Sequence, residues 1–367
     1  MIYFDNAATT PAMGERQDFF NPSSPHALGI KSERALRMAR ITIASMFNSQ
    51  SATAPNPASA VSDGVIFTSG GTESNNIAVL GHVLQHIRQG TALASFPYEH
   101  PSILAPIAFA IARSWARGVG MDAIPPQGQV LVSVSHVNHE TGDINDIAAI
   151  SAQAKAANPN AIVLVDGAQG FSKEPIPACA NIYTFSGHKC HAPTGVGGLW
   201  VGSGVRLTPI QHGGGQENDY RPGTENVSAI VQMAGAVKDL CANMAVNSTH
   251  VSKIKAEIAS LQNILPDVSV NSQGESTSPY ILNMSFLGVK GEVLVHALSE
   301  KGLYVSMGAA CRSRKRARPA LQLMGYGAHI AESAIRLSFS HLNTLEEAHT
   351  ACELIEAEVR RFRKMKG

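Results

Sequence analysis

Short apolar runs alternate with amphipathic stretches over the first two thirds of the chain. The runs at 65–68 and 161–165 are apolar on both faces, which is typical of buried strands in a parallel sheet. The stretches at 32–47 and 145–157 are predicted as helices, and in the first of them apolar residues recur at the three-to-four spacing of a buried helix face. This alternation of strand and helix predicts a doubly wound α/β sheet.

The pattern changes near residue 245. An amphipathic helix is predicted at 250–265, and a short alternating strand at 334–340. Such a mixture of elements predicts a second, smaller α+β domain. We therefore divide the chain into a large domain at 15–244 and a small domain at 245–367, to which 1–14 is added.

Composition excludes several classes of protein. The 367 residues are 44% hydrophobic and 16% charged, with a net charge of +1, which favours a well-packed globule and gives no overall attraction to nucleic acid or an anionic membrane. The apolar stretch 103–112 is too short to span a bilayer, and the N-terminus lacks the pattern of a signal peptide. Five widely spaced cysteines without a CxxC pair indicate a reducing compartment and argue against a zinc site. We expect a cytoplasmic protein that holds no metal.

Polar residues stand where the apolar runs end. In an open α/β sheet, ligands bind in the crevice at the carboxyl ends of the strands. The polar residues at these predicted positions are Thr72, His100, Asn138, Asp166, Gln169 and Lys189. Their shared placement predicts a ligand site at this edge of the sheet.

Lys189 ends the sequence Ser-Gly-His-Lys, directly after the apolar run 182–185. A lysine considered alone is most often a solvated surface residue. Together with Asp166, however, it supplies what pyridoxal phosphate requires, an amine for a Schiff base and a carboxylate against the pyridine nitrogen. Gln169 and Asn138 can hydrogen-bond the oxygen side of the ring, and His100 can stack on it.

The segment 69–76 joins a strand to a helix through two glycines, a shape that binds phosphate through free backbone N–H groups. It is neither a Walker loop nor a GxGxxG fingerprint. Thr72 can hold the phosphate there, and Ser186 and His188 can add donors. The alternative is an ordinary turn in which Thr72 caps the helix.

Cys311 follows a predicted strand in a small-residue turn and precedes the basic run 312–318. Nearby cations favour the thiolate, which is the nucleophilic form, so we prefer a mobile nucleophile over a buried loop residue. The basic run is a solvated loop by default; an acidic protein partner fits it better than nucleic acid does. Arg336 can bind a substrate carboxylate through two hydrogen bonds or form a surface ion pair.

These motifs, in this order, resemble the cysteine desulfurases of the NifS/IscS type, in the class V aminotransferase branch of fold-type I pyridoxal-phosphate enzymes. The resemblance covers nearly the whole chain. Its motifs are YFDNAATT (3–10), NPSSPHALG (21–29), FTSGGTESNN (67–76), YEH (98–100), SHVNHETG (135–142), VDGAQ (165–169), TFSGHKCHAPTGVGGLWV (184–201), GGGQENDYRPGTEN (213–226), VSMGAAC (305–311) and AIRLSFS (334–340). Compared with the same segment in the family, the segment after Cys311 is unusually basic.

The resemblance implies a large domain with a mostly parallel seven-stranded sheet between helices, plus a smaller α+β domain. It implies a cofactor, pyridoxal phosphate, held by Thr72, Asn138, Asp166, Gln169, Ser186, His188 and Lys189, with Lys189 also moving protons and His100 stacking on the ring and acting as an acid–base group. It further implies a homodimer, in which Thr224 reaches the phosphate of the neighbouring subunit.

The same resemblance implies the reaction. Asn138 and Arg336 would hold the carboxylate of L-cysteine. Cys311 would attack the substrate sulfur, giving a persulfide and L-alanine, and the sulfur would pass to an acceptor or scaffold protein for iron–sulfur cluster or thio-cofactor assembly. The alternatives are a selenocysteine lyase or another cysteine or cystine lyase of this family, and a non-enzymatic scaffold for sulfur assembly.

Overall fold

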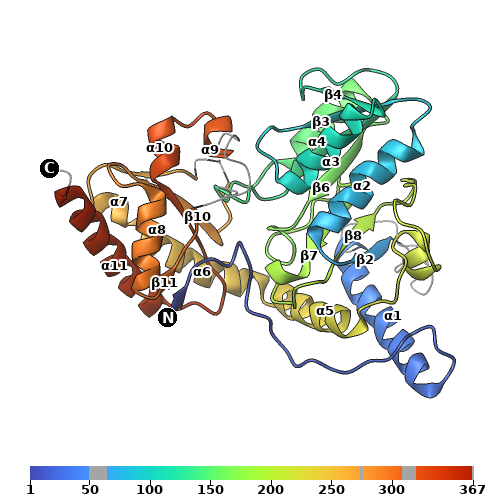
Figure 1. Ribbon diagram of the computed structural model, residues 1–367, viewed down its shortest axis with the longest axis horizontal. Helices are drawn as coiled ribbons and strands as arrows, with labels where there is room; N and C mark the ends of the chain where they lie inside the picture. The colour runs from blue at the N-terminus through green and yellow to red at the C-terminus, as the bar shows by residue number, and fades with distance from the viewer. Residues whose placement is uncertain (49–63, 273, 275, 308–319, 366–367) are drawn as a thin grey trace. The chain divides into compact units, whose positions relative to one another are not determined.

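The computed structural model describes residues 1–48, 64–272, 274, 276–307 and 320–365 (Figure 1). Its contacts divide the chain into two compact units. The larger unit contains Pro11–His136 and Asn145–Ala242, and the smaller one contains Met1–Thr10, Val137–Ile144 and Asn243–Gly367. The sequence pattern left Val137–Ile144 in the large domain, whereas its contacts place it in the smaller unit.

A seven-stranded sheet runs through the larger unit in the order β2-β8-β7-β6-β5-β3-β4. β8 runs antiparallel to β2 and β7, and the other neighbouring strands are parallel. The predicted α/β fold with a mostly parallel seven-stranded sheet is therefore confirmed. The strands are β2 (Val65–Thr68), β3 (Thr91–Ser95), β4 (Ala116–Val119), β5 (Gln129–Ser135), β6 (Ile162–Asp166), β7 (Ile182–Ser186) and β8 (Gly197–Val201).

Helices cover both faces of this sheet. Along β6, Val163 and Val165 belong to a core shared with α1 and α5, whereas Leu164 belongs to a core shared with α2 and α3. Because successive side chains of a strand point to opposite faces, a central strand covered on both faces is apolar throughout. The helices of this unit are α1 (Ala27–Asn48), α2 (Gly71–Gln85), α3 (Pro101–Ala112), α4 (Ile147–Ala157) and α5 (Val227–Ala242).

Antiparallel strands and helices build the smaller unit. Its sheet has the order β12-β10-β9, with β9 (Val268–Val270), β10 (Ile281–Phe286) and β12 (Ala334–Ser338), and β1 (Ile2–Tyr3) pairs in parallel with β11 (Leu303–Tyr304). Its helices are α6 (Met244–Ala259), α7 (Leu261–Ile264), α8 (Gly291–Glu300), α9 (Ala320–Leu323), α10 (Ala328–Ser333) and α11 (Leu345–Lys364). The segment Met1–Thr10 thus joins the C-terminal part of the chain through β1.

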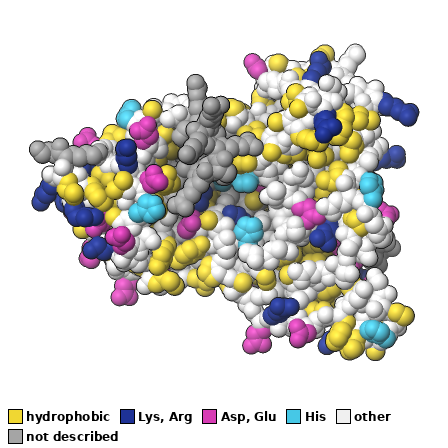
Figure 2. All heavy atoms as spheres, viewed as in Figure 1, with side chains coloured by type: hydrophobic (Ala, Val, Ile, Leu, Met, Phe, Trp, Pro, Cys, Tyr) yellow, Lys and Arg dark blue, Asp and Glu magenta, His cyan; other side chains and the backbone are white. Residues whose placement is uncertain are grey.

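Charged side chains of both signs are interspersed on the face drawn in Figure 2. This distribution agrees with the net charge of +1. Within the described ranges, no helix is long and apolar enough to cross a membrane.

Candidate active site

Lys189 lies just beyond the carboxyl end of β7, in the short 3-10 helix Gly187–Lys189. The turn requires glycine at its first position, because a Cβ on Gly187 would lie 2.7 Å from Cγ1 of Val196. Lys189 is half-buried. Burial lowers the pKa of both His100 and His188, and the Lys189 ammonium lowers both further, so its charge lies near these two imidazoles.

Asp166 ends β6 and is 6% exposed. Its Oδ2 accepts a hydrogen bond of 2.8 Å from Nδ2 of Asn75, and its Oδ1 accepts one of 3.0 Å from the backbone N–H of Ala168. Both carboxylate oxygens are therefore satisfied, as a buried acidic group requires. Gln169, three residues further on, is also buried.

His100 is the N-cap residue of α3. Its Nδ1 accepts a hydrogen bond of 3.1 Å from the backbone N–H of Ser102 and lies 2.7 Å from the Ser102 hydroxyl oxygen. The residue as a whole is exposed, so this edge of the ring is anchored while other parts of it remain accessible. Desolvation and the Lys189 ammonium lower the pKa of His100, whereas the Asp166 carboxylate opposes the shift.

The start of α2 lies beside Ser186. A Cβ on Gly71 would lie 3.5 Å from Cβ of Ser186, and the hydroxyl of Ser186 is 3.1 Å from Nδ1 of His188. The N-cap of α2 is Gly70, and no side chain caps this helix, so the alternative role of Thr72 as a helix cap is wrong. Burial, and then Lys189, lower the pKa of His188 to about 4. A helix start with uncapped N–H groups favours an anion.

These groups fit the pyridoxal phosphate that the sequence predicts. Asp166 offers a carboxylate whose two oxygens are already oriented by donors. Lys189 offers an amine close to an accessible imidazole, and the first turn of α2 offers donors for a phosphate. All of them belong to the larger unit.

Thr224 is exposed on a loop of the larger unit. Nε of Arg221 lies 3.3 Å from Oε1 of Glu73, which neighbours Thr72 on α2. Gly223 donates its N–H to Oε1 of Gln216 at 2.9 Å. These contacts hold the loop near the start of α2 and leave the Thr224 side chain on the surface.

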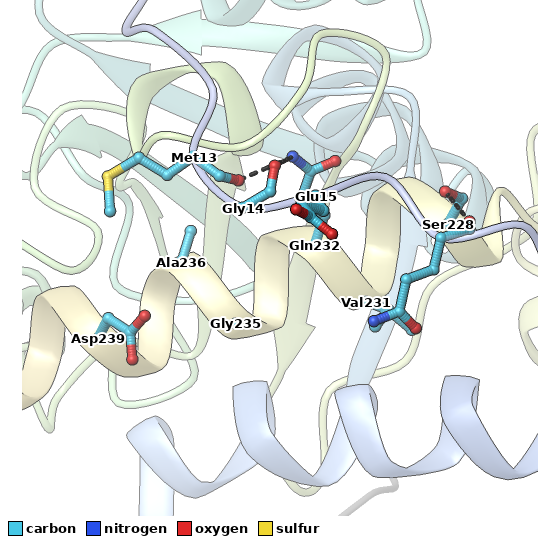
Figure 3. Close-up of a pocket in the computed structure, with 10 residues that line it drawn as sticks. Met13, Gly14, Glu15, Ser228, Val231, Gln232, Gly235, Ala236 and Asp239 are labelled. Carbon is cyan, nitrogen blue, oxygen red and sulfur yellow. Dashed lines mark hydrogen bonds between the residues drawn. The ribbon is translucent and has the colours of Figure 1, made fainter.

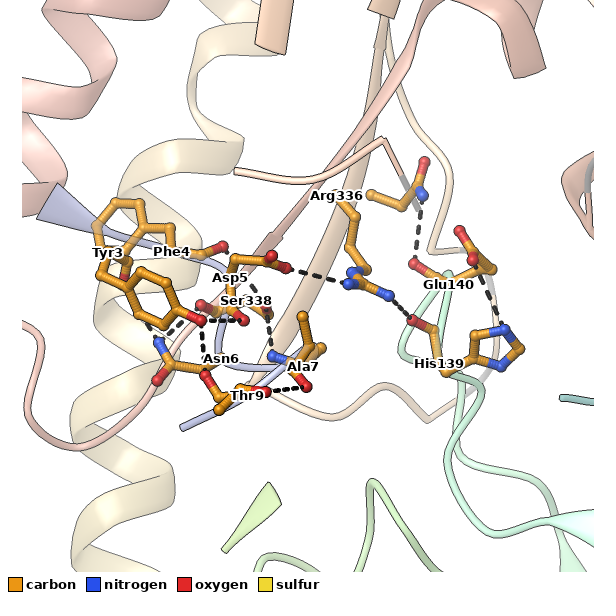
Figure 4. Close-up of polar contacts among 12 residues, drawn as sticks. Tyr3, Phe4, Asp5, Asn6, Ala7, Thr9, His139, Glu140, Arg336 and Ser338 are labelled. Atoms are coloured by element: carbon orange, nitrogen blue, oxygen red, sulfur yellow. Dashed lines mark hydrogen bonds and ion pairs between the residues drawn. The ribbon is translucent and has the colours of Figure 1, made fainter. Parts of the chain in front are cut away.

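Arg336 of β12 is buried in the smaller unit and 6% exposed (Figure 4). Its Nη2 donates to Oδ1 of Asp5 at 3.1 Å, and its Nη1 donates to the carbonyl oxygen of His139 at 2.8 Å. Its Nε is buried and has no hydrogen-bond partner among the described residues. The ion pair with Asp5 is thus partly buried, with the Asp5 side chain 24% exposed, rather than the surface pair considered as an alternative.

Asn138 also belongs to the smaller unit and is 3% exposed. Its Oδ1 accepts hydrogen bonds from the backbone N–H groups of Glu140 (2.8 Å) and Thr141 (3.1 Å). Its Nδ2 faces the sulfur of Met324 at 3.8 Å, which is a weak acceptor. The amide oxygen therefore shapes its own turn, and the NH₂ group is the part suited to a ligand.

Cys311 and the basic run 312–318 lie outside the described residues. Cys190, next to Lys189, is 1% exposed, and its Sγ lies 3.2 Å from the carbonyl oxygen of Gly187. Burial raises the pKa of this thiol to about 12. Cys190 therefore packs in the core of the larger unit.

Three residues to which the sequence analysis gave no role take part in the site, two of them inside the quoted motifs and Ser102 two residues beyond one. Asn75 bonds Asp166, Ser102 bonds His100, and Glu99 is buried near Asp166, whose charge acts on it. The available signal was their place in the strand-to-helix turns, one or a few residues from an assigned residue. Asp5 was missed in the same way, inside the motif at 3–10.

Glu99 is 3% exposed, and its Oε1 accepts hydrogen bonds from the backbone N–H (3.1 Å) and the hydroxyl (3.3 Å) of Ser135. Its Oε2 is buried and has no hydrogen-bond partner in the described part of the chain. Burial, and then the Asp166 carboxylate, raise its pKa to about 8, against the two Ser135 hydrogen bonds. Glu99 is therefore largely protonated at neutral pH in the folded protein.

We expect Glu99→Gln to remove a pH-dependent loss of stability. The folded protein binds more protons at Glu99 than the unfolded chain between the ordinary pKa of 4.5 and about 8, so stability falls as pH rises through this window. Glutamine stays neutral and does not suffer this loss. The melting temperature of the variant minus that of wild type should therefore increase from pH 5 to pH 9. Glu292→Gln, on the exposed face of α8, is the control. A constant difference for Glu99→Gln across these pH values would contradict a raised pKa.

A separate hollow of about 280 Å³ lies along α5 (Figure 3). Gln232 donates through Nε2 to the carbonyl oxygens of Met13 (2.7 Å) and Gly14 (3.0 Å), and Ser228 donates to that of Gln17 (2.6 Å). These bonds hold the segment 13–17 against the helix. None of the predicted site residues is among those that line this hollow.

Comparison with known proteins finds similarity over the whole chain. The Aminotransferase class-V family model matches residues 2–350. A NifS/IcsS protein homolog of Lactobacillus delbrueckii subsp. bulgaricus is 33% identical, over 95% of this chain and 94% of the relative. Cysteine desulfurase IscS 1 of Archaeoglobus fulgidus is 30% identical, over 100% of this chain and 98% of the relative.

Solved structures are also similar to this chain over nearly its whole length. A NifS-like protein superposes with a TM-score of 0.87 at 27% identity, over 98% of this chain and 99% of its own. A NifS-like protein from Rickettsia africae ESF-5 superposes with a TM-score of 0.81 at 26% identity, over the same shares of the two chains.

Proposed function

Because the chain belongs to the aminotransferase class-V family, we propose that it acts as a pyridoxal-phosphate-dependent cysteine desulfurase. The resemblance predicted from the motifs is confirmed by relatives named cysteine desulfurase and NifS-like protein. The observation that carries the proposal is Asp166, whose carboxylate is held by Asn75 and Ala168 in the same unit as Lys189.

Pyridoxal phosphate, when bound, supplies an electron sink for the carbon that carries the substrate amino group. Asp166 would keep a proton on the pyridine nitrogen, and Gln169 would donate to the ring oxygen. Thr72, Ser186 and His188 would bind the phosphate at the start of α2, where uncapped N–H groups favour negative charge. Lys189 would hold the cofactor covalently and would move protons at the substrate carbon.

Arg336 and Asn138 would bind the substrate carboxylate through Nε of the one and Nδ2 of the other. The thiolate of Cys311 would attack the substrate sulfur, so that an S–S bond forms while the C–S bond breaks. The electron pair of the broken bond stays on carbon, which takes up a proton to give L-alanine. The persulfide on Cys311 would then pass its outer sulfur to an acceptor or scaffold protein.

The proposed working protein is a homodimer in a reducing compartment. The exposed Thr224 would reach the phosphate site of a second copy in a homodimer. The protein would work in a reducing compartment such as the cytoplasm, which is supported by the four described cysteines being free thiols.

Incubation of the purified protein with L-cysteine and a small thiol tests this function. We expect sulfide and L-alanine in equal amounts. Selenocysteine is the competing substrate: a much higher kcat/KM for selenocysteine would assign the chain to the selenocysteine lyases instead. Absence of both products from cofactor-loaded protein would favour a non-enzymatic scaffold.

We expect Arg336→Ala to raise KM for L-cysteine about ten- to a hundredfold, because a hydrogen bond to a charged group contributes about 1.5–3 kcal/mol. The change in kcat should be smaller, since the arginine does not contact the reacting sulfur. Arg360→Ala is the control, because Arg360 forms an exposed ion pair with Glu356 on α11. An unchanged KM for Arg336→Ala would remove Arg336 from the substrate site.

A further inference from the structure

The helix α3 is apolar on all sides, yet one of its sides is exposed. Its 12 residues include no charged residue and one polar residue, Ser102. A helix that is hydrophobic all round is normally buried. Phe109 and Ile111, however, are 43% and 39% exposed. The described part of the chain thus leaves an apolar face of this helix open to solvent.

The exposed face continues from α3 towards β4, against which α3 packs (Figure 1). The rings of Phe109 and Trp115 meet at 80°, with centroids 5.6 Å apart. Ile111 lies against β4, because a Cβ on Gly118 would be 3.1 Å from its Cδ1. Phe109, Ile111 and Trp115 thus form one surface, which we call the α3–β4 face.

A hollow of about 500 Å³ opens in the α3–β4 face. Ile111 and Trp115 line it, together with Thr91 and Gln129, the first residues of β3 and β5. The hydroxyl of Thr91 is buried and has no hydrogen-bond partner among the described residues. In protein interfaces, large anchoring side chains of one partner fill pockets of the other. The hollow is large enough for such a side chain.

The charges beside the face are positive. Between His100 and Met121 the sequence contains Arg113 and Arg117 and neither Asp nor Glu. The guanidinium of Arg113 lies 5.2 Å from the centre of the Phe109 ring, and Arg117 lines the hollow. Neither arginine forms an ion pair within the described ranges. Acidic side chains of a partner would complement both of them.

The shape of α3 suits a helical partner. Ala105, Ala108 and Ala112 are exposed and recur at spacings of three and four residues. Their small side chains leave a shallow strip along the helix. The side-chain ridges of a second helix pack into such a strip.

We propose that the α3–β4 face binds a second protein through an acidic amphipathic helix. One apolar side chain of that helix fills the hollow, and its carboxylates pair with Arg113 and Arg117. A second copy of this chain fits less well, because a symmetric contact would bring the same arginines together. An anionic membrane would gain only about 1 kcal/mol from each arginine.

The partner would leave the proposed active site open. The hollow lies at the amino ends of β3 and β5, whereas Asp166 ends β6. These three strands are parallel, so the hollow and Asp166 lie at opposite edges of the sheet. The proposal therefore goes beyond the proposed function, and binding should leave sulfide release unchanged.

Fluorescence anisotropy with a labelled synthetic peptide tests the proposal. The probe is a short amphipathic helix with leucine on one face and glutamate on the other, and its control carries glutamine in place of glutamate. The wild-type protein, loaded with pyridoxal phosphate, should bind the glutamate peptide about tenfold more tightly. Added salt should weaken this binding, because the arginine–carboxylate pairs are exposed.

Two variants locate the binding. Phe109→Glu places a carboxylate in the apolar face, and Arg117→Glu reverses a charge without removing apolar surface. Each should weaken binding of the glutamate peptide about tenfold or more. Arg34→Glu makes the same charge change at an exposed position of α1 and should have no effect. If Phe109→Glu does not fold, the exposed Arg117→Glu still decides the outcome.

Four results would overturn the proposal. The first is equal binding of the glutamate and glutamine peptides, or binding of neither, and the second is an unchanged affinity in Arg117→Glu. The third is cosedimentation with phosphatidylglycerol vesicles that Phe109→Glu abolishes, which would assign the face to a membrane. The fourth is assembly beyond a dimer that Phe109→Glu abolishes, which would assign it to a second copy. These measurements do not depend on sulfide release, so they fail or succeed separately from the proposed function.

Discussion

Replacing Lys189 with alanine should reduce kcat for L-cysteine by about 10²- to 10⁴-fold, the usual contribution of a positioned proton-transfer group. The structure places this amine beside His100 and His188, whose pKa values it lowers, at the end of β7. The variant also loses the covalent attachment of pyridoxal phosphate, so the absorbance of the bound Schiff base should disappear. Sulfide and alanine assays, together with the absorption spectrum, measure both effects.

Lys238→Ala is the matched control, because Lys238 is an exposed lysine on α5 of the same unit. It should keep both the activity and the spectrum. Lys189→Ala should also raise the pKa of His188, since the ammonium that opposes its protonation is gone. Full activity in Lys189→Ala would refute the cofactor chemistry proposed for the chain.

Local patterns were sufficient to predict the alternation of strands and helices in the larger unit. The run at 161–165 is apolar on both faces, and it forms β6 with helices on each side. The same pattern placed Asp166 at the carboxyl end of β6 and Lys189 three residues beyond that of β7, where the structure has them. The roles of these two residues toward a cofactor stay predictions.

The supporting residues could not be predicted in this way because their partners are distant in sequence. Asn75 and Asp166 are 91 residues apart, and Asp5 and Arg336 are 331 apart. Spacing along the chain does not reveal such pairs. The edge strand β4 was missed for a different reason: it is only four residues long and largely exposed, so it lacks the apolar run that marks the central strands.

Contacts also explain why the boundary between the units was only partly predicted. Residues 137–144 follow β5 directly in sequence, yet Ile144 donates to the carbonyl oxygen of Ser276, and Nδ2 of Asn283 donates to that of Glu140. The local sequence of such a segment does not show which of the two units it contacts. Asn138 consequently belongs with Arg336 and not with Asp166.

Cys311→Ala should stop sulfide release, because three of the four described thiols are held largely in the unreactive protonated form. Burial raises the pKa of Cys190 and Cys352 to about 12 and that of Cys241 to about 11. A thiol of pKa about 12 is ionised to only about one part in 10⁴ at pH 8, and the thiolate is the reactive form. Sulfide and alanine should both fall to the background of the assay.

Cys352→Ala is the control, since Cys352 lies on α11 of the smaller unit with its Sγ 3.6 Å from the carbonyl oxygen of Glu257. It should lose some thermal stability and keep its activity. Mass spectrometry after a single turnover with L-cysteine should find one added sulfur on wild type and on Cys352→Ala, and none on Cys311→Ala. Alanine formation at the wild-type rate by Cys311→Ala would instead indicate a lyase in which the small thiol of the assay, and no enzyme thiol, takes the sulfur as the carbon–sulfur bond breaks.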